Sequence, residues 1–378
     1  MTQVHFKTKE LKEILKCFEK FAANSNVTPI VTVAYDPFRL IMSTDHAFVS
    51  AEPKEVSVAT PLTPFSFNIS TLLKLPLTGD EVGLFWDSEN SELGLRNHHL
   101  STSLKVAVPA PDFTAIPQSM DSFKVPLGVL VAINKYLTIP FSFFTGKKEL
   151  MPVAFEKNKE GNLTAYADDG YSLARIDTEV PVELDELEIK VPKYMLDCLY
   201  GSGDVKDETI VKVGIEGYKS SFSSNNIQIF ASGMNDELSD FATTIKGFKP
   251  RTSCEFSPKD LSQSIKPLVS ILPKKDKSET VLSVQLNNKQ KMSMAIRHAE
   301  IGDAKIDEVE GVDNVYIENH EKTSTVNMHP KSFQDYTNLF QVEKGKLKAD
   351  EKMVHYDGDI VSGGIPMKIE YLFPTVRA

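Results

Sequence analysis

Two adjacent aspartates follow a tyrosine in the middle of the chain, within the stretch TAYADDGYSLARID at residues 164–177. Paired carboxylates on a turn can hold the metal ions that assist phosphoryl transfer, so Asp168 and Asp169 could serve a nucleotidyl-transfer enzyme. The same residues also predict a plain β-hairpin, because Asp-Gly between two alternating runs favours a tight turn. The rest of the sequence must decide between the two interpretations.

A catalytic site of this kind needs groups that the sequence does not supply. Phosphoryl transfer requires at least one more carboxylate on a neighbouring strand and basic groups around a triphosphate. The chain contains no glycine-rich phosphate loop, and its eight histidines, His98 and His99 among them, lack the spacing of metal ligands. We therefore expect no catalytic residue, no cofactor and no metal site. Nucleotidyl transfer through Asp168 and Asp169 is kept only as a remote alternative.

Length and composition predict a globular protein of more than one domain. The chain has 378 residues, which suggests two or three domains, and 41% of them are hydrophobic, enough to build cores. No apolar run approaches the roughly 18 residues that a membrane helix needs. The three cysteines, Cys17, Cys198 and Cys254, form neither a zinc motif nor a disulfide framework, which fits a reducing cytoplasm.

Two local patterns recur at about one third of the chain length. Asp45 and Asp169, each at the turn of a strand–turn–strand segment, are 124 residues apart. Asp112 and Asp240, each followed by phenylalanine, are 128 residues apart, and one third of the chain is 126 residues. A fainter copy of the strand–turn–strand segment occupies residues 292–308. Such a repeat predicts three copies of one domain.

Each third also contains two predicted helical segments, recognised by apolar residues at three- and four-residue spacing. They are expected at 7–23 and 68–78, at 126–141 and 191–201, and at 257–272 and 329–340. Alternating runs between them indicate antiparallel strands. We predict an α+β fold class with three similar domains, each with two helices on an antiparallel sheet layer. The predicted bounds are 1–121, 122–248 and 249–378.

The predicted helices are more basic than the rest of the chain. With the basic residues that flank them, the six segments carry a net charge of +11, so the remainder carries −21 within the total of −10. Lysines often do no more than solvate an exposed helix face. A charge distributed this unevenly also suits a protein that holds DNA phosphates on its helices while its sheets repel them.

Six strings, in order and at matching spacing, resemble the bacterial-type DNA sliding clamps, the beta subunit of the replicative DNA polymerase III. VTPIVTVAY after the first helix is similar to the family's TLPIL strand, STDHAFVSAE to its first-domain turn, and LKVAVPAPDFTAIP to its domain-closing segment. YADDGYSLARI resembles the family's TDGhrL segment, VPKYMLDCL its vPrk segment, and EYLFPTVRA its closing segment. The low identity indicates a diverged member, such as one encoded by a phage or a plasmid.

The resemblance implies a closed ring of the DNA-clamp fold rather than an enzyme. Two chains would join as a homodimer, with basic helices around double-stranded DNA and acidic sheets outside. Such a processivity factor would tether the replicative DNA polymerase without sequence specificity, with a clamp loader as a further partner and no membrane. Its expected location is the bacterial or infected-host cytoplasm. Two alternatives stay open: a clamp-like decoy that binds replication proteins without encircling DNA, and a two-domain clamp that trimerises, which the length disfavours.

The resemblance also implies two sets of site residues. The pocket for a partner peptide is expected between the second and third domains, with walls of Gly170, Tyr171, Ser172 and Leu173 and of Leu372, Phe373, Pro374 and Thr375, and with Phe333 as an aromatic gate. DNA contacts are expected from Lys12, Lys16, Lys20, Lys74, Lys135, Lys193, Lys259 and Lys266, and from Lys147 and Lys148 in a loop. The family commonly has His-Arg where this chain has Tyr171-Ser172, so we expect a different preferred peptide. Ser25 stands where the family has an arginine that contacts DNA, a departure from the family pattern.

Overall fold

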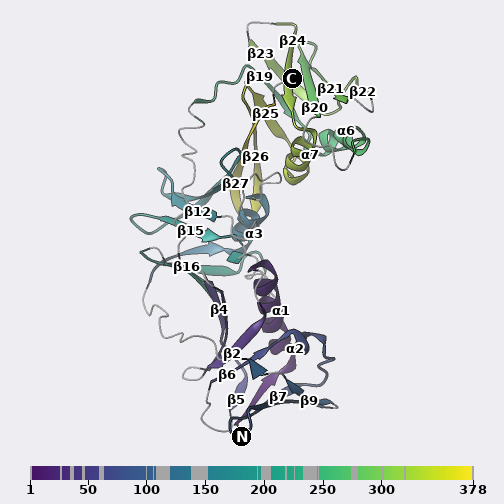
Figure 1. The fold of residues 1–378 in the computed structure, drawn as a ribbon. Coiled ribbons are helices and arrows are strands. Elements are labelled where there is room, and N and C mark those ends of the chain that lie inside the picture. Colours follow the sequence, from purple (N-terminus) through teal and green to yellow (C-terminus); the bar gives the residue numbers. More distant parts are fainter. Residues whose placement is uncertain are drawn as a thin grey trace. The chain divides into compact units, whose positions relative to one another are not determined.

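The structure of the chain is a computed structural model, shown in Figure 1. It describes residues 2–25, 28–34, 38–44, 47–58, 64–98, 100–104, 106–107, 120–137, 152–193, 195–196, 206–217, 219–224, 226–232, 245, 247–273, 280–298, 302–318 and 321–376. The chain divides into two compact units, the first made of Met1–Asn134 and Val182–Asn235 and the second of Lys135–Pro181 and Asp236–Ala378. Among the described residues no helix is long and apolar enough to cross a membrane.

The first unit contains two antiparallel sheets. Its elements are β1 (Thr2–Lys7), α1 (Thr8–Ser25), β2 (Ile30–Ala34), β3 (Arg39–Ser43), β4 (Ala47–Ala51), β5 (Val56–Val58), β6 (Phe65–Asn68), α2 (Ser70–Lys74), β7 (Glu81–Asp87), β8 (Glu92–Asn97), β9 (Leu100–Leu104), β10 (Val106–Ala107), β11 (Asp121–Pro126), α3 (Leu127–Tyr136, ending in the second unit), β15 (Glu188–Pro192), β16 (Ile210–Glu216), β17 (Lys219–Ser224) and β18 (Ile227–Ser232). The strand orders are β5-β1-β7-β8-β9 and β10-β6-β2-β3-β4-β18-β17-β16-β11.

The second unit is built in the same way. Its elements are β12 (Pro152–Lys157), β13 (Asn162–Asp168), β14 (Leu173–Pro181), β19 (Thr252–Phe256), α6 (Pro258–Ser270), β20 (Val281–Asn287), β21 (Lys291–His298), β22 (Gly302–Ile306), β23 (Val312–Ile317), β24 (Thr323–Met328), α7 (Pro330–Leu339), β25 (Gly345–Ala349), β26 (Met353–Ser362) and β27 (Ile365–Pro374). Within this unit, the strands of one sheet have the order β12-β13-β14-β27-β26-β25-β19-β23, and those of the other have the order β22-β21-β20-β24.

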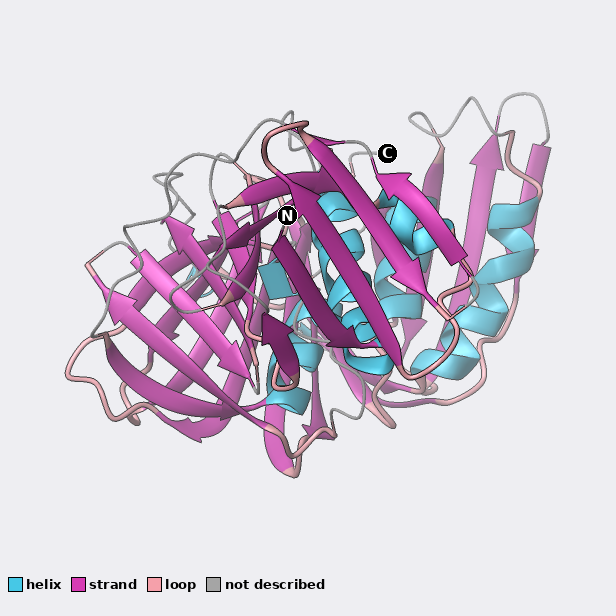
Figure 2. Cartoon of the chain, turned by 90° about the horizontal axis from the view of Figure 1, so that it is seen from below, coloured by secondary structure: helices cyan, strands magenta, loops and turns pink. Residues whose placement is uncertain are grey.

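The helices form where an apolar stripe can face a sheet. In α1, Leu11, Ile14 and Phe18 are at most 1% exposed, whereas Lys12 and Lys16 on the opposite side are exposed. This separation is the expected result of a 3.6-residue period. The stripe brings α1 against β1 and β4, and Figure 2 shows the helices lying against strands. The expected α+β class is confirmed.

The helices α6 and α7 begin at side-chain caps. Ser257 Oγ accepts the backbone N–H of Asp260 at 3.4 Å, and the imidazole of His329 accepts the backbone N–H of Ser332 at 3.3 Å. Each cap is followed by proline, whose missing N–H costs nothing in the first turn of a helix. Both helices were predicted from the sequence and are confirmed.

The order of elements recurs along the chain in a way that supports a threefold repeat. A strand precedes each of the helices α1, α3 and α6. This strand pairs with strands further along the chain and with none of the three described strands that directly follow its helix. Thus β1 pairs with β7, β11 with β16, and β19 with β25. Strands of neighbouring thirds also pair, β4 with β18 and β14 with β27. Each unit therefore contains strands of the middle third, β18 in the first unit and β14 in the second. The three domain bounds themselves stay a prediction.

Two predicted helices differ from the structure. The segment expected at 68–78 contains only α2, because the backbone at Leu75 is already extended and Pro76 cannot continue the helix. The segment expected at 191–201 begins inside β15, and within its described part only Met195 and Leu196 are helical. The predictions that concern Asp45, Lys147 and Lys148 lie outside the described residues.

We predict that Gly345→Ala destabilises the second unit. A Cβ at Gly345 would overlap the ring of buried Phe340 and lie 3.0 Å from Cζ of Phe256. Overpacking of this kind costs about 1–3 kcal/mol in the free energy of unfolding. The matched control is Gly247→Ala, where a Cβ meets nothing within 4 Å. Urea unfolding measures both, and equal stability of the two variants would contradict the packing described here.

Candidate functional site

The turn between β13 and β14 is held by its own aspartates. Asp168 Oδ1 accepts the backbone N–H of Gly170 at 3.0 Å. Asp169 Oδ1 accepts the backbone N–H groups of Tyr171 at 3.1 Å and Ser172 at 2.7 Å. Gly170 has a φ of +83°, a conformation that glycine adopts without strain. The carboxylates therefore shape the loop, as short polar side chains often do in turns.

This geometry gives no support to a metal-dependent catalytic pair. Asp168 and Asp169 are at most 9% exposed, and each has an oxygen that accepts backbone N–H groups. Where the structure describes the chain, the one group of three metal-ligating side chains with converging atoms lies elsewhere and includes neither aspartate. The nucleotidyl-transfer interpretation needs a further ligand beside the pair, and the described residues provide none.

An apolar cluster lies next to this turn, where β14 meets β27. The register places Leu173 opposite Leu372, and these side chains are 4% and 0% exposed. Three partly buried residues pack against them: Ile245, Phe248 and Met353. The cluster therefore joins segments that are distant in the sequence. A patch built from several partly exposed apolar side chains is the usual basis for binding an apolar peptide side chain.

The predicted pocket residues do not all share this surface. Because alternate residues of a strand face opposite sides, Phe373 points away from the cluster that holds Leu372. The ring of Phe373 stacks on Tyr336 of α7 at 4.4 Å. Phe333 is fully buried, with its ring edge-on to Tyr356 at 6.0 Å. In this structure both phenylalanines belong to the core between α7 and the sheet.

The remaining predicted residues occupy the two ends of the site. Tyr171 is 61% exposed at the tip of the turn, whereas Ser172 is buried. Burial raises the pKa of the Tyr336 hydroxyl above its usual value, and the neighbouring Ser172 partly offsets this rise. Ser172 therefore lies next to Tyr336, on the side of the core. Thr375, which follows the half-buried Pro374, donates its backbone N–H to the carbonyl of Lys352 at 2.8 Å.

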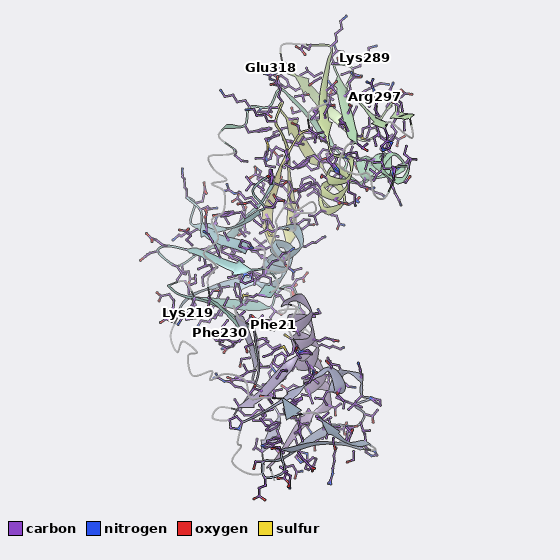
Figure 3. The ribbon with its side chains drawn as sticks, viewed as in Figure 1. Phe21, Lys219, Phe230, Lys289, Arg297 and Glu318 are labelled. Carbon is purple, nitrogen blue, oxygen red and sulfur yellow. The ribbon has the colours of Figure 1, made fainter. Side chains whose placement is uncertain are left out.

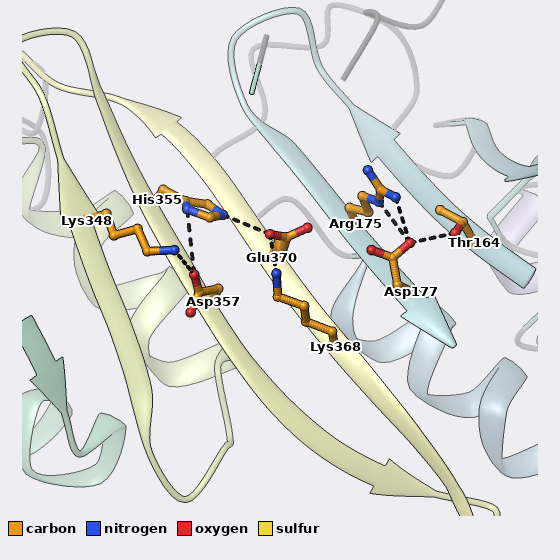
Figure 4. A network of polar contacts seen from close by, with 8 residues as sticks. All are labelled: Thr164, Arg175, Asp177, Lys348, His355, Asp357, Lys368 and Glu370. Carbon is orange, nitrogen blue, oxygen red and sulfur yellow. Dashed lines mark hydrogen bonds and ion pairs between the residues drawn. The ribbon is translucent and has the colours of Figure 1, made fainter. Parts of the chain in front are cut away.

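A buried polar network continues from the cluster along the same face of the sheet (Figure 4). His355 lies opposite Leu372, and Asp357 lies opposite Glu370, in the pairing of β26 with β27. Lys368 Nζ donates to Glu370 Oε1 at 2.9 Å. Burial by itself raises the pKa of the Glu370 carboxyl, but the contacts with His355 and Lys368 outweigh it and lower the pKa to about 2. The Glu370 carboxylate therefore stays charged although it is buried.

The network reaches the strands on either side. On β14, Arg175 Nη2 donates to Asp177 Oδ1 at 2.8 Å, and Thr164 Oγ1 on β13 donates to the same oxygen at 2.6 Å. On β25, Lys348 Nζ pairs with Asp357 (Figure 4). Asp357 and Glu370 lie opposite each other, and each of the three carboxylates, Asp177 included, pairs with a basic side chain: Lys348, Lys368 and Arg175.

Sequence reasoning did not find several residues of this region. Phe248 packs on the apolar cluster, and its ring stands edge-on to His355 at 5.7 Å, which connects the cluster with the network. Ile245 and Phe248 are three residues apart in a short apolar motif, and this was the available signal for them. His355 and Asp357 are two residues apart in an alternating strand, a spacing that puts both on one face. Met353 carried no signal of its own.

The predicted DNA-contacting lysines are mostly exposed on helices. Lys12, Lys16, Lys20, Lys74, Lys259 and Lys266 are exposed on α1, α2 and α6. Two others differ. Lys135, at the end of α3, donates its ammonium to Gln341 Oε1 at 2.8 Å, and Lys193 lies in the turn after β15. The structure thus presents most of these lysines to solvent from helices of both units.

Comparison with solved structures finds likenesses along the whole chain. The beta subunit of DNA polymerase III from Thermotoga maritima superposes with a TM-score of 0.80 at 19% identity, covering 100% of both chains. A DNA polymerase sliding clamp from Bacillus subtilis gives 0.80 at 15% identity, covering 100% of this chain and 99% of that one. A putative beta subunit from Eubacterium rectale gives 0.81 at 14% identity, with 100% of both chains covered. This chain has the sliding-clamp fold.

At such low identity the likeness establishes the fold and leaves the activity to be argued from the chain itself. No protein-family model matches the chain, and the sequence of no curated protein matches it either. The expected resemblance to bacterial clamps is confirmed at the level of the fold. The expected low identity is confirmed as well, since these structures share 14–19% of their residues with this chain.

We predict that Asp169→Ala destabilises the turn and that Asp169→Asn preserves most of it. Alanine removes the acceptor of two backbone N–H groups, which costs about 1–3 kcal/mol in the free energy of unfolding. Asparagine keeps an oxygen at Oδ1, so we expect a smaller loss. Urea unfolding of the second unit distinguishes the variants. Equal losses for alanine and asparagine would contradict a role in the turn and favour a role for the negative charge.

Proposed function

We propose that this chain is a DNA polymerase processivity factor, a sliding clamp whose two copies form a ring around double-stranded DNA. The observation that carries the proposal is the pairing of strands between thirds. Strand β4, the third of the strands after α1, pairs with β18, the last strand of the next third. Strand β14, the third of the strands after α3, likewise pairs with β27, the last strand of the third that follows.

Continuing this pattern requires a second chain. The third strand after α6 is β22, and in the described part of the chain it pairs only with β21. In the first third, β9 ends the run β7-β8-β9 as β18 ends the run β16-β17-β18, and its described partner is β8 alone. An unpaired edge is a template for another strand. Pairing of β22 with β9 of a second copy, made twice, would close a head-to-tail dimer.

The surface beside β22 is suited to such a contact. Ile271 at the end of α6, a helix that contacts β22, is 43% exposed. On β22 itself, Asp303 is exposed, and its Oδ2 lies 3.9 Å from Nε of Arg297 on β21. Figure 3 labels Arg297. An exposed large apolar residue rimmed by charges is a common feature of protein interfaces.

The helices supply the expected contacts with DNA. Lys12, Lys16 and Lys20 follow each other at four-residue spacing on α1, so they occupy one exposed face. Neither Lys12 nor Lys16 forms an ion pair with any described residue, which leaves both ammonium groups available for phosphates. Contacts with phosphates alone would hold DNA without reading its sequence.

The apolar cluster supports the second half of the proposal, the tethering of a polymerase. The partly exposed Ile245, Phe248 and Met353 form a patch over the buried Leu173 and Leu372, close in sequence to the exposed Tyr171. We infer that it accepts apolar side chains of a short peptide from a DNA polymerase or a clamp loader. A ring that cannot leave closed DNA would keep the bound enzyme at a high local concentration.

We predict that Ile271→Asp weakens the dimer, because it places a charge where the apolar contact is proposed. Sedimentation velocity at micromolar concentration should show a dimer for the parent chain and mainly monomer for the variant. The control is Val361→Asp, at a side chain that is 72% exposed on β26. A parent chain that is monomeric at this concentration would contradict a stable ring.

We predict that Lys12→Glu combined with Lys16→Glu weakens retention on DNA. Loss of two phosphate contacts in each chain, four in the dimeric ring, should reduce the slope of log affinity against log salt by about 4. The control, Lys159→Glu with Lys289→Glu, changes charge equally at exposed turns (Lys289, Figure 3) and should behave like the parent.

The assay for the ring itself uses nicked circular DNA loaded with the parent chain by the clamp loader of the same genome. The protein should resist a high-salt wash on circles and slide off when the circle is linearised. Equal loss from circular and linear DNA would reject the ring. If polymerase binding were kept in that case, the result would support the clamp-like decoy instead.

A further inference from the structure

Three side chains of the kinds that bind metal ions meet on β26 and β27 (Figure 4). His355 and Asp357 are two residues apart on β26, and Glu370 lies opposite Asp357 on β27. Alternate residues of a strand share a face, and so do directly paired residues of neighbouring strands. One ligand atom from each of the three side chains lies within 4.8 Å of the other two.

The cluster is buried although each member is polar. The exposed fractions are 4% for His355, 7% for Asp357 and 7% for Glu370. His355 Nε2 lies 3.4 Å from Glu370 Oε1, and Nδ1 lies 3.9 Å from Asp357 Oδ2. Apart from this contact with Glu370, the buried Nε2 has no hydrogen-bond partner within the described part of the chain. A buried nitrogen in this state costs free energy, and a bound cation would remove that cost.

The charges of the cluster also suit a divalent ion. Asp357 and Glu370 face each other on adjacent strands, where like charges repel unless a cation neutralises them. Lys348 and Lys368 now supply this neutralisation, and their side chains are 32% and 48% exposed. Because both lysines reach the surface, their ammonium groups can turn to water. The two carboxylates would then balance a charge of +2.

We propose that His355, Asp357 and Glu370 bind a divalent transition metal ion of the zinc type, in exchange for the ammonium groups of Lys348 and Lys368. One imidazole nitrogen with two carboxylate oxygens suits Zn²⁺, whose fourth position a water can fill. Mg²⁺ prefers oxygen ligands, so we expect it to bind less tightly. This site does not depend on the proposed clamp function.

The test is a calorimetric titration of the full chain with Zn²⁺, with metal content after gel filtration as a second readout. The parent should bind one Zn²⁺ per chain at this site, and His355→Asn should bind it more weakly by about tenfold or more. His298→Asn removes a histidine from the end of β21 and should bind like the parent. Equal Zn²⁺ affinity of His355→Asn and the parent would overturn the proposal.

A second pair of variants keeps the test decisive if His355→Asn fails to fold. Lys348→Met removes the ammonium that competes for Asp357, so Zn²⁺ should bind more tightly, by about tenfold. Lys291→Met, at the start of β21 where the ammonium pairs with Glu308 at 2.7 Å, should leave the affinity unchanged. Unchanged or weaker Zn²⁺ binding by Lys348→Met would overturn the exchange and identify the cluster as a purely structural ion-pair network.

Discussion

Backbone hydrogen bonds between β14 and β27 join two strands that are far apart in the sequence, and the candidate site depends on their register. The pairing puts Leu173 opposite Leu372 and Arg175 opposite Glu370. A register shift of one residue between the two strands would turn every side chain of one strand to the other face. Neither the apolar cluster nor the polar network would then form. The same kind of pairing joins β4 to β18, where Phe48 stacks on Phe230 at 4.6 Å (Phe230, Figure 3).

The sheet of the second unit has two faces with different chemistry. Toward α7 it carries an aromatic core in which Tyr356 meets Phe373 and Phe333. On the opposite face it carries His355 and Leu372, next to charged residues that would be costly to bury alone. Strand alternation therefore lets one pair of strands hold an aromatic core on one face and a buried polar network on the other.

Much of the fold could be predicted because its signals are local. The apolar spacing of α1 and the caps of α6 and α7 identify those helices, and the recurrent strand–turn–strand segments indicate a repeat. The errors have local causes as well. Pro76 ends α2 early, and Val191 continues a strand where a helix was expected. The site was only partly predictable, since Ile245 and Phe248 are brought to Leu173 by pairing that no short stretch of sequence reveals.

The sequence by itself determined the α+β class, the basic character of the helices and the Asp-Gly turn, because each depends on residues within a few positions of one another. Only the tertiary structure decided which side of the sheet each wall residue faces. Leu372 and Phe373 are neighbours in the chain, yet one joins the apolar cluster and the other stacks in the core. Their separation follows from strand alternation combined with a register that is set by long-range backbone hydrogen bonds.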